Sequence, residues 1–366
     1  MEKKLGFGCM RLPMKEGKVD YDEFNQMIDY YMEEGFNYFD TAHGYLNGKS
    51  ETAIRDCLSS RYPRESFVLT NKLTKPYFNS KEEIRPFFEN QLRWTGVDYF
   101  DYYLMHAQDR AIYEHFQKCE AYEVASELKR EGKIKHLGIS FHDTADVLDK
   151  ILSEHPEIEI VQIQFNYMDF KDASVQSEKV YEVCRKYNKP ILIMEPVKGG
   201  GLVRLPDEAK KIYDRINEDK HLSYASYAIR FAASFDGVFK VLSGMSDFEQ
   251  LKDNTSYMKD FEPLNEEEME AVTKVTEILK NLGGIPCTAC RYCVDGCPMK
   301  ISIPDLFSCY NAKKQFNDWN SSYYYDIHTK TNGKASDCIK CGKCEQICPQ
   351  HLPIREHLVQ VKECFE

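Results

Sequence analysis

The chain has 366 residues, of which 42% are hydrophobic and 29% are charged, enough apolar material for one large and one small domain. Its 48 Lys and Arg residues against 59 Asp and Glu residues give a formal net charge of −11, which disfavours nucleic-acid and membrane partners. No segment approaches the roughly 20 apolar residues that span a bilayer, and the opening sequence MEKKLGFGCMRLP has no signal-peptide core. We therefore expect a soluble, cytoplasmic protein.

Residues 1–262 repeat one unit, in which a short β-branched or aromatic run is followed by an amphipathic helical stretch. Eight strands that each precede a helix predict a (β/α)8 barrel. The alternative, an open doubly wound sheet, normally carries G-x-G-x-x-G after its first strand, and Gly6–Arg11 does not complete that pattern. The expected strands are Leu5–Leu12, Tyr38–Ala42, Val68–Leu73, Tyr99–Ala107, His136–His142, Ile160–Asn166, Ile191–Pro196 and Phe239–Met245.

The barrel pattern stops near residue 262, and a single polar helix follows. Asn265 is a plausible N-cap, glutamates fill the first turn, and Gly283-Gly284 end the helix. We therefore predict a barrel over residues 1–262, a connecting helix over 263–284, and a small α+β domain over 285–366.

Cysteines are concentrated in this last segment, which holds ten of the 14 in the chain. A disulfide framework suits small secreted proteins, whereas clustered cysteines in an intracellular chain indicate a metal site. The spacing C-x2-C-x2-C-x3-C-P occurs twice, and it resembles the motif of two-cluster bacterial ferredoxins. Its two copies are Cys287, Cys290, Cys293, Cys297, Pro298 and Cys338, Cys341, Cys344, Cys348, Pro349.

In this motif the fourth cysteine serves the other cluster, so the ligands of two [4Fe–4S] clusters should cross between the copies. We expect one cluster on Cys287, Cys290, Cys293 and Cys348, and the second on Cys338, Cys341, Cys344 and Cys297. The alternative metal is zinc, but a tetrahedral four-cysteine zinc site explains neither the third cysteine nor the duplication. The long spacer between the motifs contains Trp319 and Tyr323–Tyr325, which we expect to pack it onto the barrel.

Four polar residues follow three neighbouring barrel strands, where catalytic groups of such barrels lie. They are Asp40, Tyr45, Lys72 and His106. Together they suit proton donation to a carbonyl oxygen, because an ammonium stabilises a phenolate and a carboxylate holds the ammonium charged. His106 would orient the carbonyl.

The segments around these residues resemble the aldo-keto reductase superfamily. The likeness lies in Phe39-Asp40-Thr41-Ala42-x-x-Tyr45, Thr70-Asn71-Lys72-Leu73 and Asp101-Tyr102-Tyr103-Leu104-Met105-His106, and it covers residues 5–258. The whole chain resembles the bacterial members that carry a C-terminal ferredoxin-like domain. The resemblance implies Tyr45 as general acid/base, Lys72 and Asp40 as its tuning pair, and NADP or NAD as cofactor for a small carbonyl or alcohol substrate.

The positions that bind the dinucleotide in this family match only in part. Ser140 and Gln162 fit the carboxamide site, but Phe141-His142 stands in place of the asparagine. Gly244 and Gln250 replace the basic residues that hold the 2′-phosphate of NADP. We therefore expect little discrimination between NADP and NAD. The candidate cofactor contacts are Ser140, Gln162, Met194, Glu195, Gly199, Gly200, Gly201, Ser246, Asp247, Gln250 and Asn254, of which Gly199–Gly201 and Ser246–Asp247 would cradle phosphate.

Three functions remain open from the sequence. The leading one is a nicotinamide-dependent carbonyl reductase in which the clusters are structural or relay electrons. The second is an electron-transfer reductase with FMN in the barrel, because a cluster passes single electrons, a nicotinamide carries a hydride, and a flavin can mediate between them. An external electron-transfer partner is then expected. The third, a ferredoxin-like carrier on an inactive barrel, is disfavoured by the four intact catalytic positions.

Overall fold

The computed structural model describes residues 3–218, 221–287, 289–348 and 350–366, and the chain forms two compact units. The first unit comprises Met1–Phe165, Lys179–Pro196 and Ala225–Leu264. The second unit comprises Asn166–Glu178, Val197–Tyr224 and Asn265–Glu366. Two segments that the sequence analysis placed in the barrel domain therefore group with the C-terminal region.

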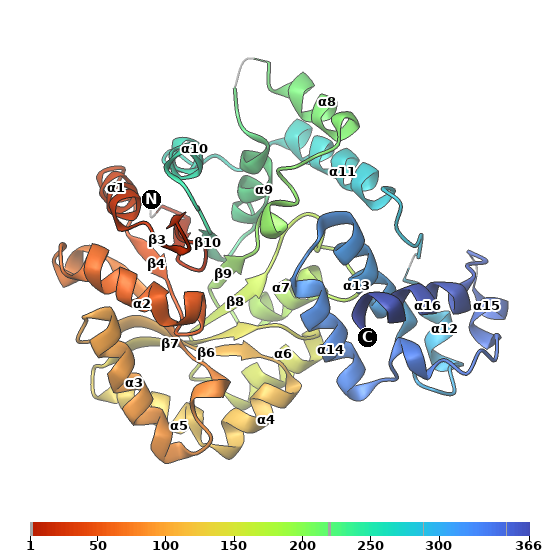
Figure 1. Ribbon diagram of the computed structural model, residues 1–366, viewed down its shortest axis with the longest axis horizontal. Coiled ribbons are helices and arrows are strands. Elements are labelled where there is room, and N and C mark those ends of the chain that lie inside the picture. The colour runs from red at the N-terminus through yellow and green to blue at the C-terminus, as the bar shows by residue number, and fades with distance from the viewer. Residues whose placement is uncertain (1–2, 219–220, 288, 349) are drawn as a thin grey trace. The chain divides into compact units, whose positions relative to one another are not determined.

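A closed barrel of eight parallel strands forms the centre of the first unit, in the order β1-β10-β9-β8-β7-β6-β5-β4 (Figure 1). The closure is made by β1, which pairs with β10 through Leu5 and Val241 and with β4 through Phe7 and Phe39. The barrel prediction is thus confirmed, with all eight expected strands present. They are β1 (Leu5–Gly8), β4 (Tyr38–Asp40), β5 (Val68–Leu73), β6 (Phe100–Gln108), β7 (Ile134–Phe141), β8 (Ile160–Gln164), β9 (Ile191–Met194) and β10 (Val238–Ser243).

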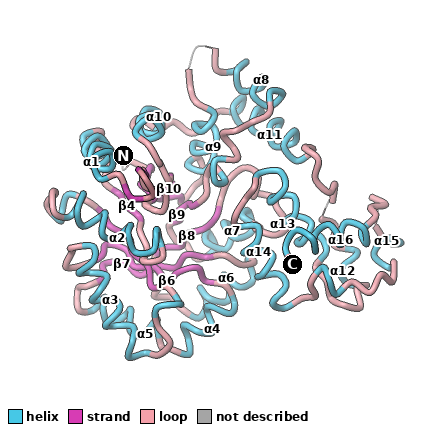
Figure 2. The backbone as a smooth tube through the Cα atoms, viewed as in Figure 1, coloured by secondary structure: helices cyan, strands magenta, loops and turns pink. Residues whose placement is uncertain are grey.

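Helices of the first unit lie outside the ring of strands, as Figure 2 shows. Several begin at an aspartate whose carboxylate accepts a backbone N–H of the first turn, as Asp20, Asp109 and Asp247 do for α1, α4 and α10. The helices are α1 (Tyr21–Glu33), α2 (Lys49–Ile54), α3 (Lys81–Thr95), α4 (Arg110–Lys118), α5 (Ala121–Arg130), α6 (Ala145–Glu154), most of α7 (Ser177–Lys186), α9 (Tyr224–Ala233) and α10 (Phe248–Met258).

The inside of the barrel is filled by side chains from several strands, including Tyr38, Leu104, Ile160, Leu192 and Leu242. Gly138 on β7 permits this packing, because a Cβ atom there would lie 2.5 Å from Ile160 Cγ2 and 2.6 Å from Leu104 Cδ2. The barrel is therefore a packed core, and its chemistry is left to residues at the C-terminal ends of the strands.

A short antiparallel hairpin of β2 (Met14–Lys15) and β3 (Lys18–Val19) was not foreseen in the sequence. Its turn places Glu16 and Gly17 at φ angles of 52° and 75°. Two consecutive left-handed residues are typical of a type I′ hairpin turn, and the Glu-Gly pair was the available signal.

The second unit is mainly helical, and its only β pairing among the residues described is the isolated bridge Ile301–Gly333. The expected connecting helix is present as α11 (Glu266–Lys280), with a capping box between Asn265 and Glu268. The other helices are α8 (Asp207–Ile216), α12 (Tyr292–Asp295), α13 (Ile303–Phe316), α14 (Asn320–Thr331), α15 (Lys343–Ile347) and α16 (Ile354–Phe365).

The core of the second unit is built by α13, α14 and α16. Phe307, Tyr324, Tyr325 and Leu358 are buried in it. The spacer between the two cysteine motifs thus supplies core residues to its own unit, whereas Trp319 is 47% exposed and lacks the packing expected from the sequence. None of the helices described is long and apolar enough to cross a membrane.

Candidate functional site

The candidate catalytic residues lie at one end of neighbouring strands. Asp40 ends β4, where it is in register with Thr70 of β5, and Lys72 of β5 is in register with Leu104 of β6. The Nζ atom of Lys72 donates to Asp40 Oδ1 at 2.6 Å and to the carbonyl oxygen of Thr41 at 2.9 Å. Both ionised side chains are buried, so the pair is shielded from water.

Tyr45 and His106 complete the group. Tyr45 lies in the loop after β4, and the Nζ atom of Lys72 is 4.9 Å from the centre of its ring. The rings of Tyr45 and His106 are 6.1 Å apart and nearly perpendicular. His106 Nδ1 lies 2.7 Å from Thr74 Oγ1, which fixes the orientation of the imidazole. The structure therefore brings all four predicted residues together.

The buried environment shifts the pKa of each group, and burial raises the pKa of Asp40 although Lys72 and Gln162 oppose this. Burial lowers the pKa of Lys72, but the Asp40 carboxylate and the Tyr45 phenol outweigh this effect and raise that pKa. Burial raises the pKa of Tyr45, and the Lys72 ammonium opposes this only in part. The net direction for Tyr45 is thus upward, whereas the sequence analysis expected Lys72 to lower it. Burial, together with Lys72 and His142, holds the pKa of His106 well below its usual value, so the imidazole is neutral.

A buried polar network supports Lys72, and sequence reasoning missed it. Glu51 is fully buried; one carboxylate oxygen lies 2.6 Å from His43 Nδ1, and the other accepts from Asn71 Nδ2 at 2.8 Å. Gln91 donates to Glu51 and to the backbone carbonyl of Lys72, both at 3.1 Å. Glu51 lies only six residues beyond Tyr45, and a glutamate so near a candidate catalytic residue was the available signal.

The residues expected to contact the nicotinamide ring lie in the last residues of β7, β8 and β9 or directly after them. Ser140 Oγ accepts from the backbone N–H of Ala107 at 2.7 Å. Gln162 lies beside Asp40, and a hydrogen bond from its amide favours the ionised form of that carboxyl group. Met194 ends β9, and Glu195 adopts a left-handed φ of 56°. Ser140 and Gln162 are thus fixed near the catalytic group through Ala107 and Asp40.

The N-terminus of α10, expected to hold phosphate, carries two carboxylates of its own. Asp247 Oδ1 accepts from the backbone N–H of Gln250 at 2.8 Å, and Glu23 of α1 accepts from that of Phe248 at 3.1 Å. The backbone N–H of Ser246 donates to the Gln250 side chain at 3.1 Å. Three donors at this helix end are therefore engaged within the protein.

Two further predicted contacts are also engaged in packing. Asn254, further along α10, donates to Ser243 Oγ at 2.8 Å and accepts from Tyr257 at 2.5 Å. The run Gly199, Gly200, Gly201 belongs to the second unit, where a Cβ atom at Gly201 would lie 3.0 Å from the ring of Phe316. These interactions give Asn254 and Gly201 a structural reason independent of a cofactor.

The cysteines of the second unit line two cavities, and the two motifs cross between them. One cavity is lined by Cys287, Cys290, Cys293 and Cys348, and the other by Cys297, Cys338, Cys341 and Cys344. The rest of each wall is largely apolar, with Ile303 common to both. Four thiols around an apolar cavity fit a [4Fe–4S] cluster, whose ligands are cysteine thiolates. Thr288 and Pro349, which lie within the motif segments, are outside the described residues.

Comparison with known proteins assigns the two parts of the sequence to two families. Residues 4–277 match the aldo/keto reductase family, and residues 286–352 match a 4Fe-4S dicluster domain. The chain belongs to the aldo/keto reductase family. This aldo/keto reductase is therefore an oxidoreductase whose C-terminal region is a 4Fe-4S dicluster domain.

Its relatives are oxidoreductases of the same fold. An uncharacterized oxidoreductase of Bacillus subtilis (strain 168) is 25% identical over 302 residues, which cover 75% of this chain and 92% of that protein. The NADH-specific methylglyoxal reductase of Escherichia coli (strain K12) is 29% identical over 184 residues, 45% of this chain and 54% of that enzyme.

Solved structures give the same result. An aldo-keto reductase from Bacillus halodurans, in its holo form, has a TM-score of 0.58 and 25% identity, and the match covers 74% of this chain and 91% of that one. An aldo-keto reductase from Klebsiella pneumoniae in complex with NADPH has a TM-score of 0.60 at 19% identity, over 75% of this chain and 95% of that one. The second likeness supports the fold alone.

Proposed function

We propose that this aldo/keto reductase reduces the carbonyl group of a small molecule, or oxidises the corresponding alcohol, with Tyr45 as the general acid or base. The observation that carries the proposal is the position of Lys72, whose ammonium lies against the Tyr45 ring and is held by Asp40 at 2.6 Å. Such an arrangement suits a phenol that gives up its proton during the reaction, because a fixed cation stabilises the phenolate that remains.

Each residue of the group then has a separate task. Tyr45 delivers its proton to the carbonyl oxygen, and Lys72 stabilises the resulting negative charge on the phenolate oxygen. Asp40 keeps Lys72 charged and fixed in the buried site. His106 is neutral, so its imidazole can donate a hydrogen bond to the substrate carbonyl without carrying charge to the site.

A nicotinamide cofactor fits beside this group, because Ser140 and Gln162 offer polar atoms to its carboxamide within the same strand ends. When bound, a nicotinamide supplies a hydride to the substrate carbon. A methylglyoxal reductase that is specific for NADH is among the relatives, which supports a small carbonyl substrate and a cofactor without a 2′-phosphate. The carboxylates of Asp247 and Glu23 at the start of α10 support the same preference.

The second unit is proposed to hold two [4Fe–4S] clusters with crossed ligands. Cys287, Cys290, Cys293 and Cys348 would hold the first, and Cys338, Cys341, Cys344 and Cys297 the second, in accordance with the two cavities that these sets line. Clusters of this kind, when bound, exchange single electrons. Electron exchange with an external partner would then accompany the barrel chemistry.

A second candidate function is an electron-transfer reductase in which a flavin takes the place of the nicotinamide in the barrel. The observation that favours it is the 4Fe-4S dicluster domain, because clusters pass single electrons, a nicotinamide carries a hydride, and a flavin can mediate between them. Under this alternative Tyr45 could still be the acid, but the substrate need not be a ketone.

The test of the leading function is Tyr45→Phe, which keeps the ring and removes the acidic proton. We expect cofactor affinity to stay within about twofold while single-turnover reduction of a reactive test carbonyl falls by roughly 10²–10⁴. Tyr21→Phe, at an exposed position of α1, is the matched control and should leave both unchanged. Full activity of Tyr45→Phe would reject Tyr45 as the acid and favour the electron-transfer alternative.

The cluster assignment has its own test. Anaerobically purified protein should contain about eight irons and eight sulfides per chain, as two four-iron clusters require. Cys348→Ala should remove the same electron paramagnetic resonance signal as Cys287→Ala, and Cys297→Ala the same signal as Cys338→Ala. Loss of one signal in both Cys348→Ala and Cys338→Ala would contradict the crossed arrangement.

A further inference from the structure

A cavity of about 520 Å³ lies entirely within the second unit. One wall is a face of α13 that includes Pro304, Ser308, Ala312 and Phe316, and another is the loop Met168–Ala173. The volume of the cavity falls within the range of roughly 300–1,000 Å³ that is usual for pockets that hold small organic ligands.

The cavity shares a wall with the first cysteine cavity. Cys287 lines both, and so do Pro304 and Gln350. A molecule in the larger cavity would therefore lie against a residue that we propose as a ligand of the first cluster. Only that residue layer would separate the molecule from the cluster, which is a short path for an electron.

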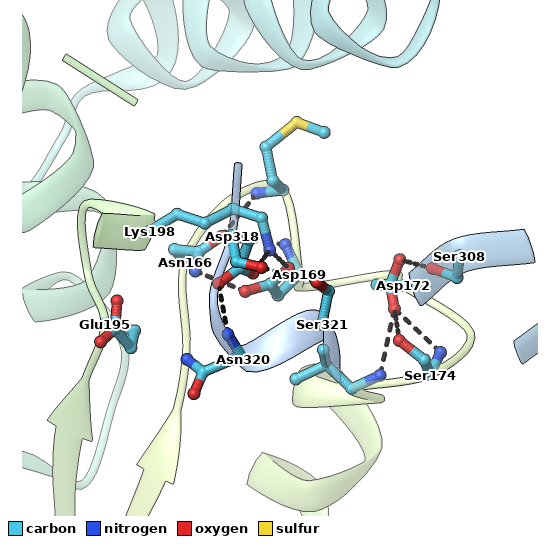
Figure 3. A network of polar contacts seen from close by, with 12 residues as sticks. Asn166, Asp169, Asp172, Ser174, Glu195, Lys198, Ser308, Asp318, Asn320 and Ser321 are labelled. Carbon is cyan, nitrogen blue, oxygen red and sulfur yellow. Dashed lines mark hydrogen bonds and ion pairs between the residues drawn. The ribbon is translucent and has the colours of Figure 1, made fainter. Parts of the chain in front are cut away.

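Both carboxylates that line the cavity, Asp169 and Asp172, already have partners (Figure 3). Lys198 is buried and pairs with Asp169 Oδ1 at 2.6 Å and with Asp318 Oδ2 at 2.8 Å. Asp172 accepts from the hydroxyl groups of Ser308 and Ser174. With its charge paired or hydrogen-bonded, each of the lining carboxylates, Asp169 and Asp172, contributes to a polar wall that suits a ligand with hydrogen-bonding edges.

Two lysines line the exposed part of the cavity and bring positive charge to it. Lys171 and Lys280 are both exposed, and no carboxylate among the residues described forms an ion pair with either ammonium. Beside them lie the amide-bearing Asn281 and Gln350. A ligand with an anionic tail would place that tail here, and its uncharged body further inside.

We propose that this cavity binds a planar, redox-active heteroaromatic ring with an anionic tail, of the flavin mononucleotide type, and that the ring exchanges electrons with the cluster beside Cys287. The proposal rests on the assignment of Cys287 to a [4Fe–4S] cluster made above. A reduced nicotinamide and a proton convert the oxidised ring to its two-electron reduced form. The reduced ring then gives one electron to each of two oxidised clusters, releases two protons and returns to its oxidised form.

The experiment is a titration of the protein, purified anaerobically with its clusters, with FMN and with riboflavin, which lacks the phosphate. Binding is read from the quenching of flavin fluorescence and needs no turnover. We expect saturable binding of one flavin per chain. Ala312→Phe fills the cavity without removing a hydrogen bond and should weaken the binding of both flavins by tenfold or more. Lys314→Phe places the same ring on an exposed position of α13 and should leave binding unchanged.

The charge of the ligand's tail is tested separately. Replacement of both Lys171 and Lys280 by Gln should weaken FMN about tenfold, as expected for lost charge-assisted contacts, and leave riboflavin unchanged. The control is Gln at both Lys313 and Lys314 of α13, which lie outside the cavity lining. A larger effect on riboflavin than on FMN would contradict the assigned place of the tail.

Two results would overturn the proposal. The first is no saturable binding of either flavin to protein whose clusters are intact by iron analysis, which would leave the carbonyl reductase function standing. The second is binding that Ala312→Phe does not change, which would place the flavin elsewhere, as the barrel alternative requires. Loss of carbonyl reduction in Tyr45→Phe is measured independently and distinguishes failure of this site from failure of the proposed function.

Discussion

Lys72 is the residue on which the barrel site depends. Its ammonium has no exposure to water and is held by Asp40, by the carbonyl of Thr41 and by the nearby ring of Tyr45. A cation fixed in this way needs no rearrangement when a phenolate forms beside it, and such preorganised charge is usually the largest electrostatic contribution to catalysis. The protonation states of its neighbours follow from the same burial.

The first prediction at this scale concerns pH. Reduction requires the protonated phenol, and since the pKa of Tyr45 lies above its ordinary value of about 10, the proton stays on across the neutral range. The pKa of His106 lies well below its usual value, so that residue does not titrate near neutrality. The rate of the reductive chemical step should be flat from about pH 6 to 9 and fall only above about 10. A change in this rate near pH 6.5 that disappears in His106→Gln would contradict the prediction.

The second residue-scale prediction concerns the stability of the Asp40–Lys72 pair. Because both groups are buried, Lys72→Met alone leaves an uncompensated carboxylate and Asp40→Asn alone an uncompensated ammonium. Each single change should lower the free energy of unfolding by about 3–5 kcal/mol, and the double variant should lose clearly less than the sum. Denaturant titration of the three variants measures this coupling. Additive losses would show that the two charges do not stabilise each other.

At the scale of elements, parallel strands and one helix end determine what the barrel can bind. The strands deliver polar residues to one end, whereas α10 begins with carboxylates at the end that would favour anions. Asp247 caps its own helix by accepting the backbone N–H of Gln250, and Glu23, which belongs to α1, accepts that of Phe248. A phosphate at this place would meet two negative charges in addition to the favourable helix dipole.

The element-scale prediction concerns the choice between NADH and NADPH. The dissociation constants of the unsubstituted protein for NADH and for NADPH should agree within about tenfold. Asp247→Ser combined with Glu23→Gln removes both charges and keeps a capping side chain, so NADPH affinity should rise about three- to tenfold with little change for NADH. Glu33→Gln, an exposed change on the same α1, is the control. A hundredfold preference of the natural protein for NADPH in a direct titration would contradict this account.

Sequence patterns predicted the elements better than the contacts between them. The eight strands and the four polar residues at or just after their C-terminal ends could be located because hydrophobic periodicity and strand ends are local properties. The role of Glu23 could not be predicted, because Glu23 lies 225 residues before Phe248, whose backbone N–H it accepts. The packing of Asn166–Glu178 and Val197–Tyr224 could not be predicted either. Their sequence is typical of a barrel domain, but they pack with the C-terminal region.

At the scale of the whole molecule, three separate stretches of chain build the second unit, and Lys198 joins them. Lys198 comes from Val197–Tyr224, Asp169 from Asn166–Glu178, and Asp318 from the C-terminal region. All three side chains are buried. One lysine therefore holds the two inserted segments to the helices that follow the first cysteine motif.

The last prediction tests this junction with Lys198→Met, which leaves Asp169 and Asp318 buried without a cation. We expect a loss of about 3–5 kcal/mol in the stability of the second unit, measured as hydrogen-exchange protection of α13. Lys210→Met, which removes an exposed pair with Asp207 on α8, should cost less than about 1 kcal/mol. The variant Asp169→Asn/Lys198→Met/Asp318→Asn, which has no charge left to compensate, should recover part of the loss.

The effect of Lys198→Met should also depend on pH, with a sign fixed by Asp169. Burial already raises the pKa of Asp169 in the native protein, and loss of Lys198 removes the charge that opposes this rise. A folded state whose carboxyl pKa is raised binds its proton more tightly than the unfolded chain, so stability is lost as pH rises above the ordinary value of about 4. The destabilisation should therefore be larger at pH 8 than at pH 5. An equal loss at both values would show that the two carboxylates find other partners when the lysine is removed.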